Sequence, residues 1–402
     1  MTSLSKSGEF VVRISLLFLA GLLLAEGHQN WIRGKITTHP EVVILIIATY
    51  LFAFTLFFLA TLRPLNLRLG STIALLAIIF IIVVSAYVIA AVEFDGVYRT
   101  DAMALSHQAA KVLLHGDNPY TSDLQEGLAT FSVDPEFLTL TSTGKIITTM
   151  NYPALHFLIF LPAVAIGIPD MRFVVFAFEF ATLLLMYRKL PPHFKIIGLL
   201  PILAGSDLAI GFTSGSLTDF LWILPLIIAA FEIDKPLRAG VAYGFACAIK
   251  QITWLAFPFL LVWQWKSAPN DLRKRCCLRF LSYTSLAFLV PNIPFIIWNL
   301  PAWIDGVLTP VSAGLVILSQ GLSMISQVSG VPLPPVFYMI CTVTIFFVLL
   351  LNYYLYFDRL KFALWAFPPL ILWFSFRALQ TYFVHWIPLL IVAITQISVE
   401  ER

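Results

Sequence analysis

The chain has 402 residues, of which 59% are hydrophobic and 12% charged, and its mean hydropathy is +0.89. A soluble domain carries about twice this fraction of charged residues, so the composition excludes an ordinary soluble enzyme. The formal net charge of +3 comes without a block of basic residues, which argues against nucleic acid as a partner. Four cysteines without metal-ligand spacing indicate neither a zinc site nor a disulfide framework.

Long apolar runs predict an all-α, polytopic transmembrane helical bundle, because a bilayer span needs about 20 apolar residues. Lys250–Gln251 interrupts the run 239–266, which predicts two short helices there. Arg377 lies in the middle of 361–397, which predicts a helical hairpin. The predicted number of spans is 11 to 13. The candidate spans are 11–27, 42–62, 71–92, 152–168, 172–187, 196–212, 216–232, 239–266, 279–299, 333–357 and 361–397.

The first of these runs resembles a secretory signal sequence, because Lys6 and Arg13 precede a short apolar stretch. No convincing small-residue cleavage site follows it. We therefore expect this run to be a retained first span.

Lysine and arginine in the loops predict how the bundle is oriented. Residues 1–402 are expected to form one integral membrane domain. The segments 93–150 and 300–332 contain few basic residues and are predicted to lie on the outer or lumenal side. The alternation of sides does not close between 150 and 195, so one segment there is re-entrant or is not a span. The loops predicted to be cytoplasmic are 188–195, 266–279 and 358–361.

Residues 100–116 have the pattern of a short amphipathic helix. Thr100 is the predicted N-cap, and Asp101 falls in the first turn, where the helix dipole favours a carboxylate. Apolar residues recur on one face, and His107 begins a polar stripe that recurs every four residues. We expect an interfacial helix on the outer membrane surface; a packing helix with a solvated face is the alternative.

The order of residues around this helix resembles the first outer loop of membrane glycosyltransferases with the GT-C fold. Within that class it is most similar to the mannosyltransferase-like families that use polyprenyl-phosphate sugars. Asp101, an alanine-rich amphipathic turn and the sequence LLHGDNPY at 113–120 carry this resemblance. Further stretches that match in order are Tyr152–Leu155, Gly244–Gln251 and Arg377–Phe383, so that the resemblance covers most of 93–390.

The chain also departs from these families. Leu105 and Ser106 stand where relatives often have an aromatic residue and a histidine. The outer loop 213–216 lacks the Gly-Gln-x-Asn pattern of many relatives, and about residues 1–70 add two spans before the usual first helix.

The resemblance implies transfer of a hexose, such as mannose, from a polyprenyl-phosphate donor to an acceptor hydroxyl at the outer leaflet, with inversion. A hydroxyl is a poor nucleophile, so a carboxylate must take its proton as the bond forms. The leaving lipid phosphate is a weak base and needs no general acid, unlike the leaving group in glycoside hydrolysis. One carboxylate and cations for the phosphate are therefore the minimal requirement.

Asp101 is the predicted catalytic base, and Asp95 is the alternative for this role. Ionisable groups inside apolar runs are costly and indicate function. A lysine that snorkels to the headgroups is the alternative for Lys250, and an interfacial anchor is the alternative for Arg377. The residues predicted to bind substrate are Asp95, His107, Tyr120, Asp219, Lys250, Gln251, Arg377 and Tyr382.

The sequence contains no Walker motif, no dinucleotide fingerprint and no metal-ligand spacing. It therefore predicts no cofactor, although a divalent ion held by Asp95 or Asp101 with the substrate phosphate stays open. The expected partners are the polyprenyl-phosphate sugar, membrane lipid and a glycolipid, glycan or protein acceptor. The expected location is the cell membrane with the site facing outside, or the lumenal face of the endoplasmic reticulum in a eukaryote.

Two other functions remain open from the sequence. A secondary transporter or lipid flippase would show inverted repeats and polar groups near the bilayer midplane; no repeat is visible in the sequence. A non-catalytic GT-C relative that holds partner subunits is the other alternative.

Overall fold

The structure is a computed structural model, and it is almost entirely helical. Asp95, the alternative base, lies outside the described residues. The described residues are 6–33, 41–63, 65, 67–91, 97–192, 194–198, 213, 215–311, 314–331 and 333–400.

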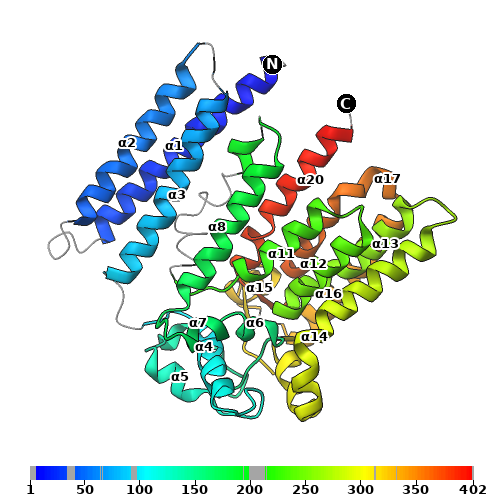
Figure 1. Ribbon diagram of the computed structural model, residues 1–402. Coiled ribbons are helices and arrows are strands. Elements are labelled where there is room, and N and C mark those ends of the chain that lie inside the picture. The colour runs from blue at the N-terminus through cyan, green and yellow to red at the C-terminus, as the bar shows by residue number, and fades with distance from the viewer. Residues whose placement is uncertain are drawn as a thin grey trace.

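Three long helices open the chain, and Figure 1 shows them side by side at one edge of the molecule. They are α1 (Lys6–Arg33), α2 (Glu41–Thr61) and α3 (Leu67–Ala91). These helices cover the three N-terminal runs that the sequence predicts as spans. α1 and α2 pack closely on each other, and α3 also contacts α8 (Arg172–Lys189).

A layer of short helices lies at the lower end of the molecule in Figure 1, below the long helices. Within this layer, α4 packs against α5, α6 and α7. The layer contains α4 (Asp101–Leu114), α5 (Gln125–Thr130), a 3-10 turn at Pro135–Phe137, α6 (Leu155–Leu158) and α7 (Leu161–Ala165).

The burial of α4 differs from the sequence prediction of an interfacial helix with a solvated polar stripe. Every residue from Asp101 to Ala110 is buried, including His107. The short helices α5, α6 and α7 pack against α4, so its first three turns are part of the protein core and carry no solvated polar stripe.

The prediction of a span at 152–168 is wrong. The chain forms only the four-residue α6 and the five-residue α7 there, and Gly167 then turns the backbone at φ +79°. A span would need about 20 helical residues. Prolines explain the interruption, because Pro153 precedes α6 and Pro162 can occupy only the first turn of α7. Without this segment, the predicted alternation of sides closes between 150 and 195.

The second half of the chain forms the remaining helices, and a kink at Asn299 interrupts α14. The segments before it are α11 (Phe220–Phe231), α12 (Pro236–Ile249), η3 (Gln251–Ala256) and α13 (Phe257–Ser267). α14 (Arg273–Leu308), η4 (Thr309–Val311), α15 (Leu322–Val328), α16 (Pro335–Leu355) and α17 (Phe357–Leu360) follow. η5 (Lys361–Trp365), α18 (Phe367–Trp373), α19 (Thr381–Val384) and α20 (Ile387–Glu400) complete the chain.

Two predicted helix breaks are confirmed. The run 239–266 is interrupted at Lys250, whose backbone is extended at φ −150° and ψ 135°. The run 361–397 is interrupted at Arg377, which lies in the two-residue strand β2 (Arg377–Ala378) between α18 and α19. Both basic residues are therefore placed at a break between helices.

A small sheet joins three loops next to these breaks. β2 pairs in parallel with β1 (Leu318–Ser319). Isolated bridges join Leu140 to Ile146 and Thr141 to Leu315. Backbone hydrogen bonds thus fix the segment around Thr141, the segment around Leu318 and the segment around Arg377 relative to one another.

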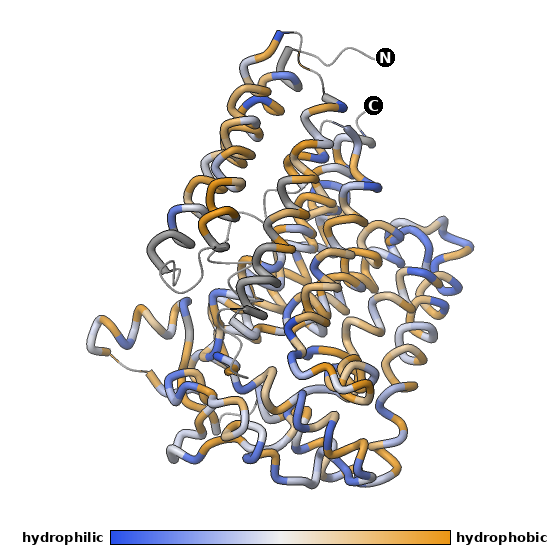
Figure 2. Tube along the Cα trace, turned by 60° about the vertical axis from the view of Figure 1, so that its left-hand side comes forward, coloured by the Kyte–Doolittle hydropathy of each residue, from blue (hydrophilic) through white to orange (hydrophobic). Residues whose placement is uncertain are grey.

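Within the described part of the chain, three helical stretches have the length and apolar composition to cross a membrane: Arg273–Leu308, Pro335–Leu355 and Thr381–Ser398. Figure 2 shows that the long helices are hydrophobic along most of their length. α16 leaves large apolar side chains uncovered, such as Ile340 and Phe347, each 61% exposed. An apolar face of this extent is typical of a helix that contacts lipid.

Candidate functional site

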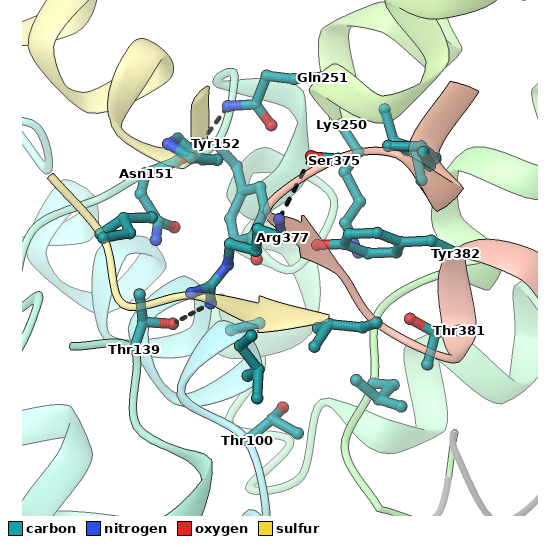
Figure 3. A pocket seen from close by; sticks show the side chains of 18 of the residues that line it. Thr100, Thr139, Asn151, Tyr152, Lys250, Gln251, Ser375, Arg377, Thr381 and Tyr382 are labelled. Atoms are coloured by element: carbon teal, nitrogen blue, oxygen red, sulfur yellow. Dashed lines mark hydrogen bonds between the residues drawn. The ribbon is translucent and has the colours of Figure 1, made fainter. Parts of the chain in front are cut away.

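A cavity of about 930 Å³ lies where the start of α4 meets the helix breaks at Lys250 and Arg377. Five of the residues predicted to act in the site line this cavity, although they come from segments far apart in the sequence. Figure 3 shows the side chains of Lys250, Arg377 and Tyr382 around it. The five residues are Asp101, Lys250, Gln251, Arg377 and Tyr382.

Asp101 is the first residue of α4, and its side chain is held from outside its own helix. The carboxylate Oδ2 accepts a hydrogen bond of 2.7 Å from the backbone N–H of Thr139. Thr100 occupies the N-cap position, as predicted, but its hydroxyl donates to the carbonyl of Ser216 instead of capping the helix. The loop of Thr139 therefore holds the carboxylate, and the segment of Ser216 holds the residue that precedes it.

The surroundings of Asp101 act on its pKa in opposite directions. Burial, which leaves Asp101 8% exposed, is the largest effect and raises the pKa above the ordinary value. Hydrogen bonds from the hydroxyl and the N–H of Thr139 and the charge of Arg377 lower it, but they do not cancel the effect of burial. A carboxylate with a raised pKa is a stronger base than an exposed one.

Arg377 reaches Asp101 through Thr139. Its Nη2 donates a hydrogen bond of 3.1 Å to Thr139 Oγ1, drawn in Figure 3. The backbone of Arg377 is fixed by its pairing with Leu318 and by a bond from its N–H to Ser375 Oγ. The guanidinium has five N–H donors, so it has further donors for an anion in the cavity.

Lys250 forms a direct ion pair with Asp219. Its Nζ lies 2.7 Å from Asp219 Oδ1, which also accepts a 2.8 Å hydrogen bond from Trp222 Nε1. Asp219 is 1% exposed and is not among the residues that line the cavity. The ammonium also lies 5.4 Å from the ring centre of Tyr382 and 5.8 Å from that of Tyr152, at cation–π range.

Gln251 lines the cavity and also connects three segments. Its Nε2 donates to the carbonyl of Asn151 at 2.9 Å and to that of Val307 at 2.7 Å. Both amide hydrogens are thereby assigned to backbone groups, which leaves the side-chain carbonyl as the group that can accept from a ligand.

Besides Asp219, two further residues predicted to bind substrate, His107 and Tyr120, are not among those that line the cavity. His107 Nδ1 is 3.0 Å from the hydroxyl of Tyr98, and its ring stacks on Phe131 at 4.5 Å. Burial lowers the pKa of His107 to about 3, and the charge of Lys111 acts in the same direction. The hydroxyl of the buried Tyr120 donates to the carbonyl of Tyr152 at 2.7 Å. Both side chains contact protein groups in the lower layer.

Several residues that line the cavity carry no recognisable pattern in the sequence. Thr139 contacts Asp101 and Arg377, yet it lies in a loop without periodicity or motif. One side of the cavity is apolar, and its α16 residues were predicted only as part of a span. The apolar lining includes Ile252, Leu255, Met339, Val343, Phe346 and Leu372.

The described residues contain no group of three or more histidine, cysteine, aspartate or glutamate side chains that could hold a metal ion. Comparisons of the chain with protein-family models, with curated proteins and with solved structures each give no match.

Proposed function

We propose that the protein is a membrane glycosyltransferase of the GT-C type that transfers a hexose from a polyprenyl-phosphate donor to an acceptor hydroxyl. One observation carries this proposal. A buried carboxylate, Asp101, and two cations, Lys250 and Arg377, line one cavity that continues into an apolar wall. A donor with a phosphate head and a hydrocarbon chain has the same division into polar and apolar parts.

The polar end of the cavity matches the chemistry of sugar transfer. In the proposed reaction, Asp101 takes the proton of the acceptor hydroxyl while the hydroxyl oxygen bonds to the anomeric carbon. The bond between that carbon and the phosphate oxygen breaks, and the departing lipid phosphate takes the electron pair. Arg377 and Lys250 stabilise its charge, because cations placed where charge develops lower the barrier.

The apolar wall matches the donor lipid. Met339, Val343 and Phe346 line the cavity and belong to α16, which also has an exposed apolar face. A polyprenyl chain in the bilayer could therefore lie along α16 while its phosphate meets the cations. In this proposal the chain spans the membrane many times, and the cavity opens at the outer or lumenal side.

The proposal is tested with purified protein in lipid nanodiscs that contain the membrane's own acceptors. The protein is supplied with a radiolabelled hexose on polyprenyl phosphate or on a nucleotide. We expect label to move to lipid or glycan from the lipid-linked donor alone. The matched control is Asp134→Asn, because Asp134 is an exposed carboxylate of the lower layer that does not line the cavity.

Two outcomes would contradict the proposal. Absence of transfer from every lipid-linked hexose, together with uptake of a solute or lipid into sealed vesicles, would indicate a transporter or flippase. Transfer that is equal in the wild type and in Asp101→Asn would remove the assignment of the base.

A further inference from the structure

Thr139 contacts both charged partners of the cavity, and its two polar groups have different roles. Its backbone N–H donates to Asp101 Oδ2 at 2.7 Å, and its Oγ1 accepts from Arg377 Nη2 at 3.1 Å. The residue is 8% exposed and lines the cavity itself. Thr139 therefore joins the Asp101 carboxylate to the Arg377 guanidinium through two hydrogen bonds.

The direction of these hydrogen bonds follows from chemistry. A guanidinium can only donate, so Thr139 Oγ1 must be the acceptor in its bond to Arg377. The hydroxyl proton of Thr139 is then available to a different acceptor, and the Asp101 carboxylate is the acceptor that its N–H already contacts. A hydroxyl that accepts from a cation is also a better donor, because hydrogen bonds in a chain polarise one another.

Backbone hydrogen bonds hold the segment that carries Thr139 in place. Thr139 also accepts a backbone bond from Ile147 N–H at 2.9 Å. The following residues pair with Leu315, and the strand at Leu318 pairs with Arg377 itself. The sheet thus sets the distance between the backbone of Arg377 and the loop of Thr139.

We infer that Thr139 is a positioning residue that couples the phosphate-binding cation Arg377 to the base Asp101 through its hydroxyl. The hydroxyl holds the guanidinium toward the cavity and stabilises the ionised carboxylate. This inference rests on the proposed function for the roles of the two charged residues, while the coupling itself is a property of the folded protein.

Other charged and titratable groups face the same cavity and must be distinguished from Asp101 in any pH measurement. They are Arg99, Glu136, Tyr152, Lys250, Arg377 and Tyr382. Glu136 is the other carboxylic acid in this set, and Glu136→Gln therefore serves as the control for the group that titrates.

The test uses Thr139→Val, which removes the hydroxyl, keeps the N–H and has nearly the same shape. Thr139→Ser restores the hydroxyl, and Thr143→Val makes the same change at an exposed position of the same loop. Two readouts are compared in nanodiscs: hexose transfer as a function of pH, and titration of the Asp101 carboxyl by infrared difference spectroscopy with labelled aspartate. Asp101→Asn assigns the infrared band.

For Thr139→Val we expect transfer to fall by about 10- to 100-fold, which corresponds to loss of hydrogen bonds to charged groups. A base works in its ionised form, so activity is lost as pH falls through its pKa. Loss of the Thr139 hydroxyl removes a hydrogen bond that stabilises the carboxylate and so raises that pKa. The acidic side of the pH–activity profile and the infrared titration should therefore both move to higher pH. Thr139→Ser and Thr143→Val should match the wild type, and Glu136→Gln should leave the acidic side of the profile in place.

Two results would overturn the inference. One is an unchanged infrared titration of Asp101 in folded Thr139→Val, whatever its activity. The other is a Thr139→Ser variant that behaves like Thr139→Val, because the methyl group and not the hydroxyl would then matter. If the wild type transfers no hexose, the proposed function fails, while the infrared titration still decides whether Thr139 is coupled to Asp101.

Discussion

Two cation–carboxylate arrangements contribute a cation to the cavity lining, and they differ in how the two charges are connected. Lys250 and Asp219 are in direct contact at 2.7 Å, and Asp219 is closed off from the cavity. Arg377 and Asp101 both line the cavity and are joined through Thr139. The first arrangement compensates its own charges, whereas the second leaves donors and acceptors for a ligand. In the proposed reaction, Asp219 therefore holds Lys250 in place at the cavity, whereas Asp101 and Arg377 keep polar groups for a ligand.

The largest expected effect is a loss of stability when the ion pair between Lys250 and Asp219 is broken. Asp219→Asn leaves the ammonium of Lys250 buried without its counter-charge, and loss of one partner of a buried pair costs about 3–5 kcal/mol. We expect the free energy of unfolding in a denaturing-detergent titration to fall by this amount. The double variant Lys250→Met/Asp219→Leu should recover most of the stability, because it buries no charge. A change below about 1 kcal/mol in Asp219→Asn, the range of an exposed pair, would contradict the assignment.

The next largest effect is expected on donor binding when Arg377, which is joined to Asp101 through Thr139, is replaced. Arg377→Gln removes the cation that we propose to contact the donor phosphate, so we expect KM for the lipid donor to rise by about 10- to 100-fold. Initial transfer rates against donor concentration measure this change. Arg279→Gln, an exposed arginine at the start of α14, should leave KM unchanged. Equal KM values for both variants would mean that Arg377 does not contact the donor.

A smaller effect is expected in the pH profile. Burial raises the pKa of Asp101, so kcat/KM should fall as pH drops through a value above the ordinary carboxylate range of about 4. The charge of Arg377 lowers this pKa, so Arg377→Gln should move the acidic limb to still higher pH. An acidic limb at or below about pH 4 in the wild type would show that the base is not a buried carboxylate.

The smallest effect is expected at His107, which lies in the lower layer away from the cavity lining. His107→Phe keeps the stacking on Phe131 and loses one neutral hydrogen bond to Tyr98. We expect a loss of about 1 kcal/mol in unfolding free energy and an unchanged rate of transfer. A fall of more than about tenfold in the transfer rate of His107→Phe, without loss of stability, would indicate that His107 takes part in the reaction.

Hydrophobic periodicity and the positions of charged residues predicted where the long helices are interrupted. Lys250 and Arg377 interrupt apolar runs, and the structure breaks the helices at both positions. Prediction failed at 152–168, where hydrophobic content suggested a span. Composition alone cannot separate a long apolar helix from short buried ones, and the prolines that divide this segment were the signal.

Contacts between segments that are distant in sequence determine the positions of His107 and Thr139, which the sequence could not indicate. His107 and Asp101 lie on the same short helix, but packing against Tyr98 and Phe131 leaves the histidine off the cavity lining. The loop of Thr139 is placed by its pairing with Leu315, and Leu318, a few residues further along, pairs with Arg377; both segments lie far away in sequence. A loop threonine has no local pattern that reveals such a contact.

The most direct test of the account is a single-turnover measurement with donor already bound to the protein. Equilibrium binding of radiolabelled polyprenyl-phosphate hexose and the rate of its first transfer are measured in the wild type and in Asp101→Asn. We expect similar donor binding in both proteins and a first transfer that is at least about 100-fold slower in Asp101→Asn, because a general base contributes at least this factor. Equal first-turnover rates in the two proteins would contradict it.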